Sequence, residues 1–264
     1  MYYKDRIVWI TGASSGIGAA LAQELSRQGS TIILSARNIK KLEEVRQTLD
    51  DPARHEVLPL DLTNITSLEG KAKEAVGYYG RVDFLINNGG VSQRSLAIET
   101  DIETDRKLIE TNYLGPVALT KALLPSMLSL NKGHIVVVSS LTGKFGTPLR
   151  SGYAASKHAL HGFFDALRAE MWREGIAVTL VCPGYIKTDI SINAMTGDGT
   201  PQGTMDKGQA NGMSPEVLAR KILRAVEGGK NEVYLGGFER FGVYIKRFFP
   251  DLFCRMIRNA SVTG

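Results

Sequence analysis

The stretch TGASSGIG, residues 11–18, decides how this chain folds. It follows the apolar run RIVWIT and begins the amphipathic run GIGAALAQELSRQG, so it lies where a strand passes into a helix. Gly12 permits a tight turn, Gly16 lets a phosphate approach the backbone at the positive helix end, and Gly18 lets the helix pack close to the sheet. The alternative is an ordinary glycine-rich turn, but the position between strand and helix favours a dinucleotide-phosphate site.

The rest of the chain alternates short apolar runs with longer amphipathic runs. The runs that predict strands are residues 6–11, 30–37, 55–62, 81–88, 133–140, 175–184 and 231–235. The runs that predict helices include 16–29, 38–49, 67–80, 101–129 and 150–174. This alternation predicts an α/β, Rossmann-type, doubly wound fold over residues 1–264, with seven mainly parallel strands and helices on both faces. Ligands of such sheets bind at the carboxyl ends of the strands.

Composition excludes several classes of protein. The chain has 264 residues, a net charge of +5 and no block of like charges, so we expect no nucleic-acid partner. Two cysteines cannot build a disulfide framework, and Cys182 is expected to be a small buried hydrophobic residue. We see no signal peptide and no stretch of roughly 18 apolar residues, which favours a cytoplasmic protein.

Motifs along the chain identify a family resemblance. They are TGASSGIG, NNGG (87–90), Asn112, Ser140, YAASK (153–157) and PG (183–184), in this order. The sequence thus resembles the classical short-chain dehydrogenases/reductases over nearly its whole length. NNGGVSQRSL and YAASKHALHGFF look closest to the branch of the 11-beta-hydroxysteroid dehydrogenase-like and dehydrogenase-reductase member 7-like reductases. The family more often has NNAG than NNGG, a difference of one methyl group that we expect to be harmless.

Tyr153 and Lys157 are one helical turn apart, so a phenol lies beside an ammonium group. A free tyrosine has a pKa of about 10, and a nearby ammonium group favours the phenolate. By resemblance, Tyr153 is the acid/base, Lys157 lowers its pKa and binds the nicotinamide ribose, Ser140 donates to the substrate oxygen, and Asn112 holds a water of the proton relay. Each of these polar residues has a plainer alternative as a helix cap or a satisfied core group.

The end of the second strand predicts the choice of cofactor. Ala36 stands where relatives that use NAD place an aspartate, and Arg37 stands where relatives that use NADP place a basic residue, so NADP(H) is favoured over NAD(H). Asp61 is expected to contact the adenine, although a role at the start of the next helix is the alternative. Asn87, with Gly89 and Gly90, would secure the central strand and let the backbone approach the cofactor. The full set of expected cofactor contacts is Gly12, Ser14, Ser15, Gly16, Ile17, Gly18, Arg37, Asp61, Leu62, Asn88, Gly89, Tyr153, Lys157, Pro183, Gly184 and Thr188.

The substrate side is less well defined by the sequence. The Gly-, Thr- and Asn-rich residues 185–213 predict a substrate lid. The expected substrate is a small carbonyl or alcohol compound, apolar and steroid-, retinoid- or ketone-like. Arg94 either meets an anionic substrate group or, as we favour, pairs within the protein. We assign no catalytic role to His158 or His161 and expect no metal site.

The last segment, about residues 236–260, is aromatic and basic, and Pro250 is expected to divide it into two short helices. It either contacts a membrane surface peripherally or, as we favour, covers the pocket or a partner subunit. The resemblance also implies a homodimer or homotetramer that pairs through residues 101–129 and 150–174. The rival function is a catalytically silent dinucleotide-binding regulator or scaffold. The presence of all four catalytic-type residues instead favours an NADP(H)-dependent oxidoreductase.

Overall fold

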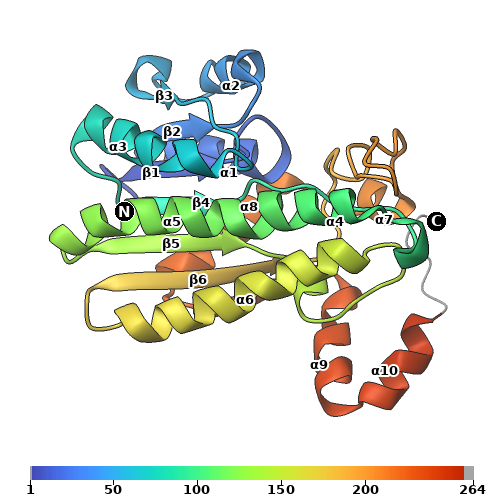
Figure 1. Ribbon diagram of the computed structural model, residues 1–264. Coiled ribbons are helices and arrows are strands. Elements are labelled where there is room, and N and C mark those ends of the chain that lie inside the picture. Colours follow the sequence, from blue (N-terminus) through green and yellow to red (C-terminus); the bar gives the residue numbers. More distant parts are fainter. Residues whose placement is uncertain (1, 259–264) are drawn as a thin grey trace.

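The computed structural model describes residues 2–258 and contains one seven-stranded sheet (Figure 1). The strands follow the order β3-β2-β1-β4-β5-β6-β7, and every neighbouring pair is parallel. Their bounds are β1 (Ile7–Thr11), β2 (Thr31–Ser35), β3 (Glu56–Val57), β4 (Phe84–Asn87), β5 (Gly133–Val138), β6 (Ile176–Pro183) and β7 (Glu232–Leu235). The predicted doubly wound α/β fold is therefore confirmed.

Helices cover both faces of the sheet (Figure 1). Apolar side chains of α1 and α8 pack on one face, and those of α3, α5 and α6 pack on the other. The helix bounds are α1 (Gly16–Arg27), α2 (Ile39–Arg46), α3 (Leu68–Tyr79), α4 (Ile102–Ile109), α5 (Gly115–Ser129), α6 (Ser151–Met171), α7 (Lys207–Ala210), α8 (Pro215–Glu227), α9 (Phe241–Phe248) and α10 (Pro250–Ile257).

The sequence of β1 explains why this strand lies inside the sheet with helices on both faces. All five of its residues are buried. Val8 and Ile10 pack into the cluster beneath α1 and α8, whereas Ile7 and Trp9 pack into the cluster beneath α3, α5 and α6. Successive side chains of a strand point to opposite faces, so a strand covered on both sides must be apolar throughout.

The third strand is shorter than the sequence predicts. Residues 55–62 were expected to form it, but only Glu56 and Val57 do so. Pro59, whose missing N–H group would point away from β2, is tolerated because β3 lies at the edge of the sheet. The chain nevertheless continues beside β2, because the N–H groups of Leu58 and Leu60 donate to Leu34 and Ala36.

The long helical region predicted over residues 101–129 is divided in the structure. A π-helical segment, Glu110–Leu114, separates α4 from α5. Pro116, in the first turn of α5, has no N–H group to donate to the carbonyl of residue 112, and the wider turn absorbs this loss. The segment carries Asn112, one of the predicted catalytic residues.

The C-terminal residues form two short helices, α9 and α10, beside the body of the molecule (Figure 1). Pro250 is the first residue of α10, as predicted. Residues 259 and 260 of the predicted extension lie outside the described part of the chain. The predicted lid, 185–213, contains only one short helix, α7, together with isolated bridges such as Ile186 to Met213.

Candidate active site

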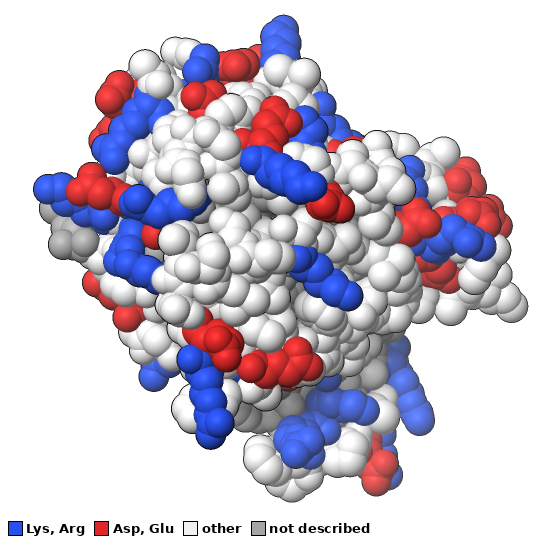
Figure 2. Space-filling view, turned by 60° about the vertical axis from the view of Figure 1, so that its left-hand side comes forward, with Lys and Arg blue, Asp and Glu red and all other residues white. Residues whose placement is uncertain are grey.

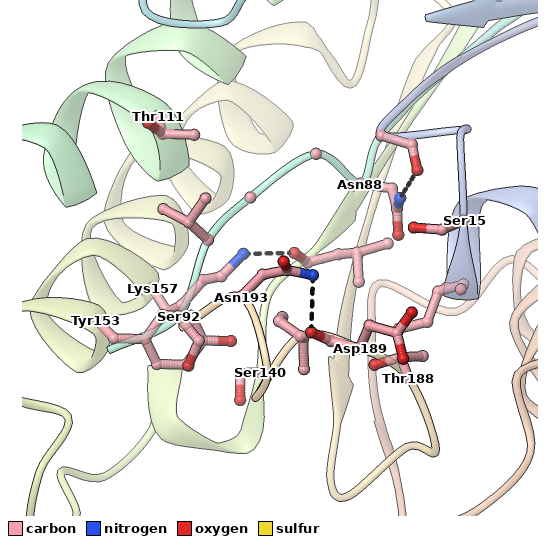
Figure 3. A pocket seen from close by; sticks show the side chains of 18 of the residues that line it. Ser15, Asn88, Ser92, Thr111, Ser140, Tyr153, Lys157, Thr188, Asp189 and Asn193 are labelled. Carbon is pink, nitrogen blue, oxygen red and sulfur yellow. Dashed lines mark hydrogen bonds between the residues drawn. The ribbon is translucent and has the colours of Figure 1, made fainter. Parts of the chain in front are cut away.

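A cavity of about 570 Å³ opens at the carboxyl ends of the strands (Figure 3). The chain leaves β1 toward β2 on one side and returns to β4 on the other, which is the switch point where open α/β sheets bind ligands. Most of the predicted site residues line this cavity: Gly12, Ser14, Ser15, Gly16, Ile17, Arg37, Asp61, Leu62, Asn88, Gly89, Ser140, Tyr153, Lys157, Pro183, Gly184 and Thr188. Gly18 and Asn112 are not among its lining residues.

The first turn has a conformation that only glycine adopts without strain. Gly12 has a φ of +65°. A Cβ atom on Gly18 would lie 2.3 Å from the carbonyl oxygen of Gly12, so any side chain there would push α1 away from the turn. Asn88 fixes the turn from the neighbouring strand, because its Nδ2 donates to the carbonyl oxygens of Thr11 and Gly12 at 3.0 and 3.2 Å.

The N-terminus of α1 faces the cavity without a side-chain cap. Ser15 is the N-cap residue, and its side chain makes no capping hydrogen bond within residues 2–258. Ser15 and Gly16 both line the cavity. The first amide groups of α1 are therefore available to an anion, which is the arrangement that a dinucleotide pyrophosphate requires.

The two asparagines of the NNGG motif make different contacts. Asn87 is buried, and its Nδ2 donates to Thr120 Oγ1 on α5 at 2.9 Å. Asn88, rather than Asn87, lines the cavity. Gly89, which stands where the family more often has alanine, would bring a Cβ atom within 2.8 Å of Leu62 Cδ1. In this chain the space of that methyl group is therefore taken by the Leu62 side chain.

Tyr153, Lys157 and Ser140 approach one another on one side of the cavity (Figure 3). Tyr153 and Lys157 lie on α6, with the Lys157 Nζ atom 5.9 Å from the centroid of the Tyr153 ring. Lys157 Nζ donates to the carbonyl oxygen of Val138, at the end of β5, at 3.0 Å. Ser140 follows the same strand and caps a short 3-10 helix, Leu141–Gly143, by accepting a hydrogen bond from the N–H group of Thr142.

The electrostatics of Tyr153 differ from the prediction that Lys157 lowers its pKa. Burial raises the pKa of Tyr153, and hydrogen bonds with Ser140 and the charges of Arg150 and Arg94 offset this only in part. Lys157 is itself buried, and that burial lowers its pKa to about 8. Desolvation outweighs the charge effects here because both side chains are almost completely buried.

Asn112 lies behind the cavity wall and is fully buried. Its Oδ1 accepts a hydrogen bond from the Val91 N–H group at 2.8 Å, and its Nδ2 donates to the Val91 carbonyl oxygen at 2.9 Å. The same Nδ2 donates to Ser156 Oγ on α6 at 3.0 Å. Asn112 therefore ties the loop after β4 to the helix that carries Tyr153 and Lys157.

The other end of the cavity carries basic groups. Arg37 follows β2 and is exposed, and Lys41 of α2, which the sequence analysis did not single out, lines the same region. Asp61 lies both at the cavity, where an adenine contact was predicted, and beside Thr63, near the start of the next helix. It lines the cavity, and its Oδ1 accepts hydrogen bonds from the N–H and hydroxyl groups of Thr63 at 2.9 and 2.8 Å.

The substrate end of the cavity carries a buried ion pair. Arg94 Nε donates to Asp206 Oδ2 at 2.8 Å, and its Nη1 donates to Ser92 Oγ, also at 2.8 Å. Arg94 thus pairs within the protein, which was the favoured alternative. The sequence analysis missed Arg150 and Tyr185, which line the same end. No motif singles them out, and only the folded chain shows that residues 150, 185 and 206 are neighbours.

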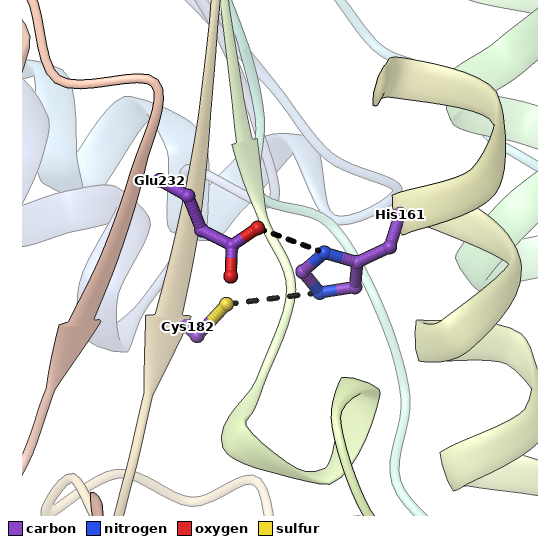
Figure 4. A group of neighbouring side chains, drawn as sticks. All are labelled: His161, Cys182 and Glu232. Atoms are coloured by element: carbon purple, nitrogen blue, oxygen red, sulfur yellow. Dashed lines mark hydrogen bonds and ion pairs between the residues drawn. The ribbon is translucent and has the colours of Figure 1, made fainter. Parts of the chain in front are cut away.

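His161, Cys182 and Glu232 form a cluster behind the site (Figure 4). His161 Nε2 lies 3.1 Å from Ser139 Oγ and 3.7 Å from Cys182 Sγ. The Glu232 carboxylate already accepts a hydrogen bond from Lys144 Nζ at 2.9 Å, and that ammonium group balances its charge. No spacing of His, Cys or acidic residues in the sequence signals this cluster. The hydrogen bonds of the three side chains with one another and with Ser139 and Lys144 make the cluster a polar network that joins α6, β6 and β7.

Comparison with known proteins identifies the class to which this fold and cavity belong. The sequence model described as short chain dehydrogenase matches residues 6–198. The chain belongs to the short-chain dehydrogenase/reductase family, whose members are oxidoreductases that bind nicotinamide dinucleotides. Within the family it groups with the dehydrogenase/reductase member 7B and 7-like branch.

The similarity to that branch extends over nearly the whole chain. The chain is 44% identical to "Dehydrogenase/reductase SDR family member 7B" of Xenopus laevis over 96% of this chain and 80% of that protein. It is 43% identical to "Dehydrogenase/reductase SDR family protein 7-like" of Drosophila melanogaster over 97% of this chain and 81% of that protein.

Solved structures share the fold. A short chain dehydrogenase from Burkholderia cenocepacia, in complex with NADP, superposes with a TM-score of 0.81 at 25% identity and covers 98% of this chain and 100% of its own. A short chain dehydrogenase/reductase from Burkholderia phymatum, in complex with NAD, superposes with a TM-score of 0.83 at 22% identity and covers 96% of each chain. Both nicotinamide cofactors thus occur on this fold.

Proposed function

We propose that the protein is an NADP(H)-dependent carbonyl reductase that acts on a predominantly apolar ketone or aldehyde. The observation that carries the proposal is the meeting of Tyr153, Ser140 and Lys157 at the cavity that also contains the glycine-rich turn. The rival, a silent dinucleotide-binding regulator, would have no need of all three groups at one cavity wall.

The residues that line the cavity offer partners for each polar part of the cofactor. The uncapped N-terminus of α1 and the turn at Gly12 would hold the pyrophosphate, and Lys157 would bind the nicotinamide ribose. Arg37 and Lys41 would pair with the 2′-phosphate of NADP, since the carboxylate that NAD requires is replaced by Ala36. When bound, the cofactor supplies the hydride for carbonyl reduction.

Tyr153 supplies the proton in this proposal. Its raised pKa keeps the phenol protonated near neutral pH, which is the form that donates to a substrate oxygen as negative charge develops there. Ser140 donates a second hydrogen bond to the same oxygen and stabilises that charge. Asn112 holds α6 in register with the loop after β4 and so positions Tyr153 and Lys157. A protonated tyrosine suits reduction better than oxidation.

The proposal is tested by measuring oxidation of NADPH and of NADH with ketosteroids, retinals, quinones and small ketones. We expect at least one apolar carbonyl compound to be reduced, with kcat/KM about tenfold or more higher with NADPH than with NADH. Tight binding of NADPH without turnover of any carbonyl compound would favour the regulator.

The C-terminal helices pack one side against residues near the cavity and leave the other side exposed. Val243 of α9 and Phe253 of α10 are buried against Leu141 and Phe145, and Phe145 lines the cavity. Other apolar side chains of this segment are exposed: Phe238, Phe241, Tyr244, Phe248, Phe249, Leu252 and Met256. Lys and Arg side chains gather beside them at the bottom of Figure 2.

We propose that this aromatic and basic surface contacts anionic lipids peripherally. No helix in the described part of the chain is long and apolar enough to span a bilayer.

We also propose a homodimer or homotetramer. The outer sides of α5 and α6 carry apolar side chains that the sheet covers only in part, among them Leu124, Leu128, Phe163 and Met171. Two copies that pair through these helices would complete their burial.

A further inference from the structure

Arg150 lies in the cavity wall with hydrogen-bond donors that are not used. Its side chain is 8% exposed. The Nε and Nη2 atoms have no hydrogen-bond partner within residues 2–258. Buried polar groups are nearly always hydrogen-bonded, so these unpaired donors call for a partner, and Arg150 lines the cavity in which a ligand would supply one.

The charge around Arg150 is also unbalanced. Asp206 is the carboxylate nearest to both Arg94 and Arg150, with Arg94 Nε at 2.8 Å and Arg150 Nη2 at 3.6 Å from its Oδ2 atom. The other groups that act on Arg150 are the phenols of Tyr185 and Tyr153, and its guanidinium carbon lies 5.7 Å from the centroid of the Tyr185 ring. Two guanidinium groups and one carboxylate leave one net positive charge beside Tyr153. Burial, together with the charge of Arg94, accordingly lowers the pKa of Arg150.

A second unused donor lies on the same segment. Thr147 Oγ1 is buried, has no hydrogen-bond partner in the described chain, and belongs to a residue that lines the same cavity. Between the two, Leu149 has a φ of +62°, a conformation that a bulky residue seldom adopts. The Leu149 carbonyl oxygen accepts a hydrogen bond from the Ser95 N–H group at 3.2 Å, which fixes the segment against the loop after β4. Tyr153 follows three residues after Arg150.

We propose that Arg150 and Thr147 bind an anionic group of the substrate, a carboxylate or a phosphate, close to the carbonyl that Tyr153 protonates. This inference rests on the proposed reductase function and narrows its substrate to an amphiphile with an anionic end. The planar fork of arginine matches the oxygen atoms of either anion, and a hydroxyl group adds a third donor. Ile190, Met195 and Pro201 line the same cavity and would contact the apolar part.

Neutral substrates and the cofactor fit these donors less well. A neutral hydroxyl or ketone group would satisfy the hydrogen bonds but would leave the net positive charge buried. The phosphate groups of the cofactor are assigned to the glycine-rich turn and to Arg37, and these residues follow the strands β1 and β2. Arg150, by contrast, is the N-cap residue of α6, the helix that carries Tyr153.

The first test measures binding alone, by calorimetric titration of the full chain with NADP⁺ present. The probes are octanoate, octyl phosphate and octanol. We expect the better anionic probe to bind at least tenfold more tightly than octanol, and Arg150→Gln to weaken it by about 10- to 100-fold while changing octanol less than threefold. Thr147→Val should weaken the same probe by about three- to tenfold. The tighter of the two anionic probes identifies the source of the charge.

The controls separate a local effect from misfolding. Arg173→Gln removes an exposed arginine beyond the other end of α6 and should leave all three affinities unchanged. Arg150→Lys keeps the charge but loses the fork, so its affinity for the anion should lie between those of the parent protein and Arg150→Gln. Unchanged NADP⁺ binding shows that each variant is folded. Equal binding of anionic probes and octanol by the parent protein would overturn the proposal, as would anion affinities that do not depend on Arg150.

The second test compares the reduction of a keto acid with that of its methyl ester. We expect Arg150→Gln to lower kcat/KM for the acid by about 10- to 100-fold and that for the ester less than threefold. If the ester is reduced, the acid is not preferred and anions bind no better than octanol, the anion site is wrong and the reductase function stands. If anions bind through Arg150 but no carbonyl compound is reduced, the reductase function is wrong and the anion site stands.

Discussion

Arg37 would distinguish two cofactors that differ by a single phosphate group. It borders the cavity where β2 ends, and Ala36 offers no competing carboxylate. We expect Arg37→Ala to raise the KM for NADPH by about 10- to 100-fold, since an arginine–phosphate pair is charge-assisted, and to change the KM for NADH less than threefold. Lys40→Ala, which removes an exposed neighbour that does not line the cavity, is the matched control. An equal rise for both cofactors would show that Arg37 does not choose between them.

Single residues also show where sequence reasoning reaches its limit. Helical spacing paired Tyr153 with Lys157, and the family resemblance assigned their roles and selected Ser140; the structure places all three at one cavity. Arg150 was not found, because its meaning depends on Asp206, a residue far along the chain that becomes its neighbour only on folding. The direction of the Tyr153 pKa shift was wrong for a similar reason. Burial depends on the whole cavity wall, whereas sequence spacing shows only the adjacent ammonium group.

Among the secondary-structure elements, the contact between the first turn and α1 can be tested by substituting two glycines with alanine. A Cβ atom on Gly18 would meet the Gly12 carbonyl oxygen at 2.3 Å, whereas a Cβ atom on Gly77 of α3 meets no atom of residues 2–258 within 4 Å. We expect Gly18→Ala to destabilise the protein by about 1–3 kcal/mol and to weaken dinucleotide binding. Gly77→Ala should stabilise it by about 0.5–1 kcal/mol, because alanine is the better helix former.

Urea unfolding at pH 7, with NADPH titration of each folded variant, checks both expectations. If Gly18→Ala were as stable as the parent protein and bound NADPH equally well, the close packing of α1 on the turn would not matter for the site. The Gly77→Ala control shows whether the added methyl group or its surroundings cause the change.

Helices and strands were predicted best where the apolar pattern is compatible with only one kind of secondary structure. The strands β1 and β5 were found because runs such as IVWIT are buried on both faces. The third strand was overestimated, because an apolar pattern shows that residues 55–62 lie against the sheet but not where their regular pairing with β2 stops. The π-helical segment was missed because one wider turn before Pro116 hardly changes the spacing of the apolar residues along the helix.

At the scale of the whole molecule, the state of assembly follows from the outer surfaces of α5 and α6. We expect sedimentation equilibrium at micromolar concentration to give the mass of a dimer or tetramer. Phe163→Glu, which places a charge on the proposed interface, should shift the mass toward the monomer, because a buried charge without a partner is costly. A parent protein that is monomeric at these concentrations would contradict the assembly.

The C-terminal surface gives a second prediction at this scale. Exposed aromatic and basic groups on α9 and α10 should bind vesicles that contain anionic lipids. We expect the full chain to sediment with such vesicles at low salt and to be released at high salt, because charge attraction is screened. Phe248→Ser together with Phe249→Ser, both on exposed residues, should reduce binding without the loss of Phe253 packing that a truncation after Gly237 would cause. Failure of the parent protein to bind at low salt would rule out the membrane contact.

The central claim is that Tyr153 protonates a carbonyl group while NADPH reduces it. The most direct measurement is a single turnover with NADPH that carries deuterium at both C4 positions, using a carbonyl substrate found in the screen. We expect an alcohol product with one deuterium on its carbinol carbon. We also expect Tyr153→Phe to bind NADPH normally but to form this product at least about a hundredfold more slowly, because general acid catalysis contributes on that scale. Product without deuterium would show that NADPH is not the hydride donor, and undiminished labelling by Tyr153→Phe would show that Tyr153 is not the acid.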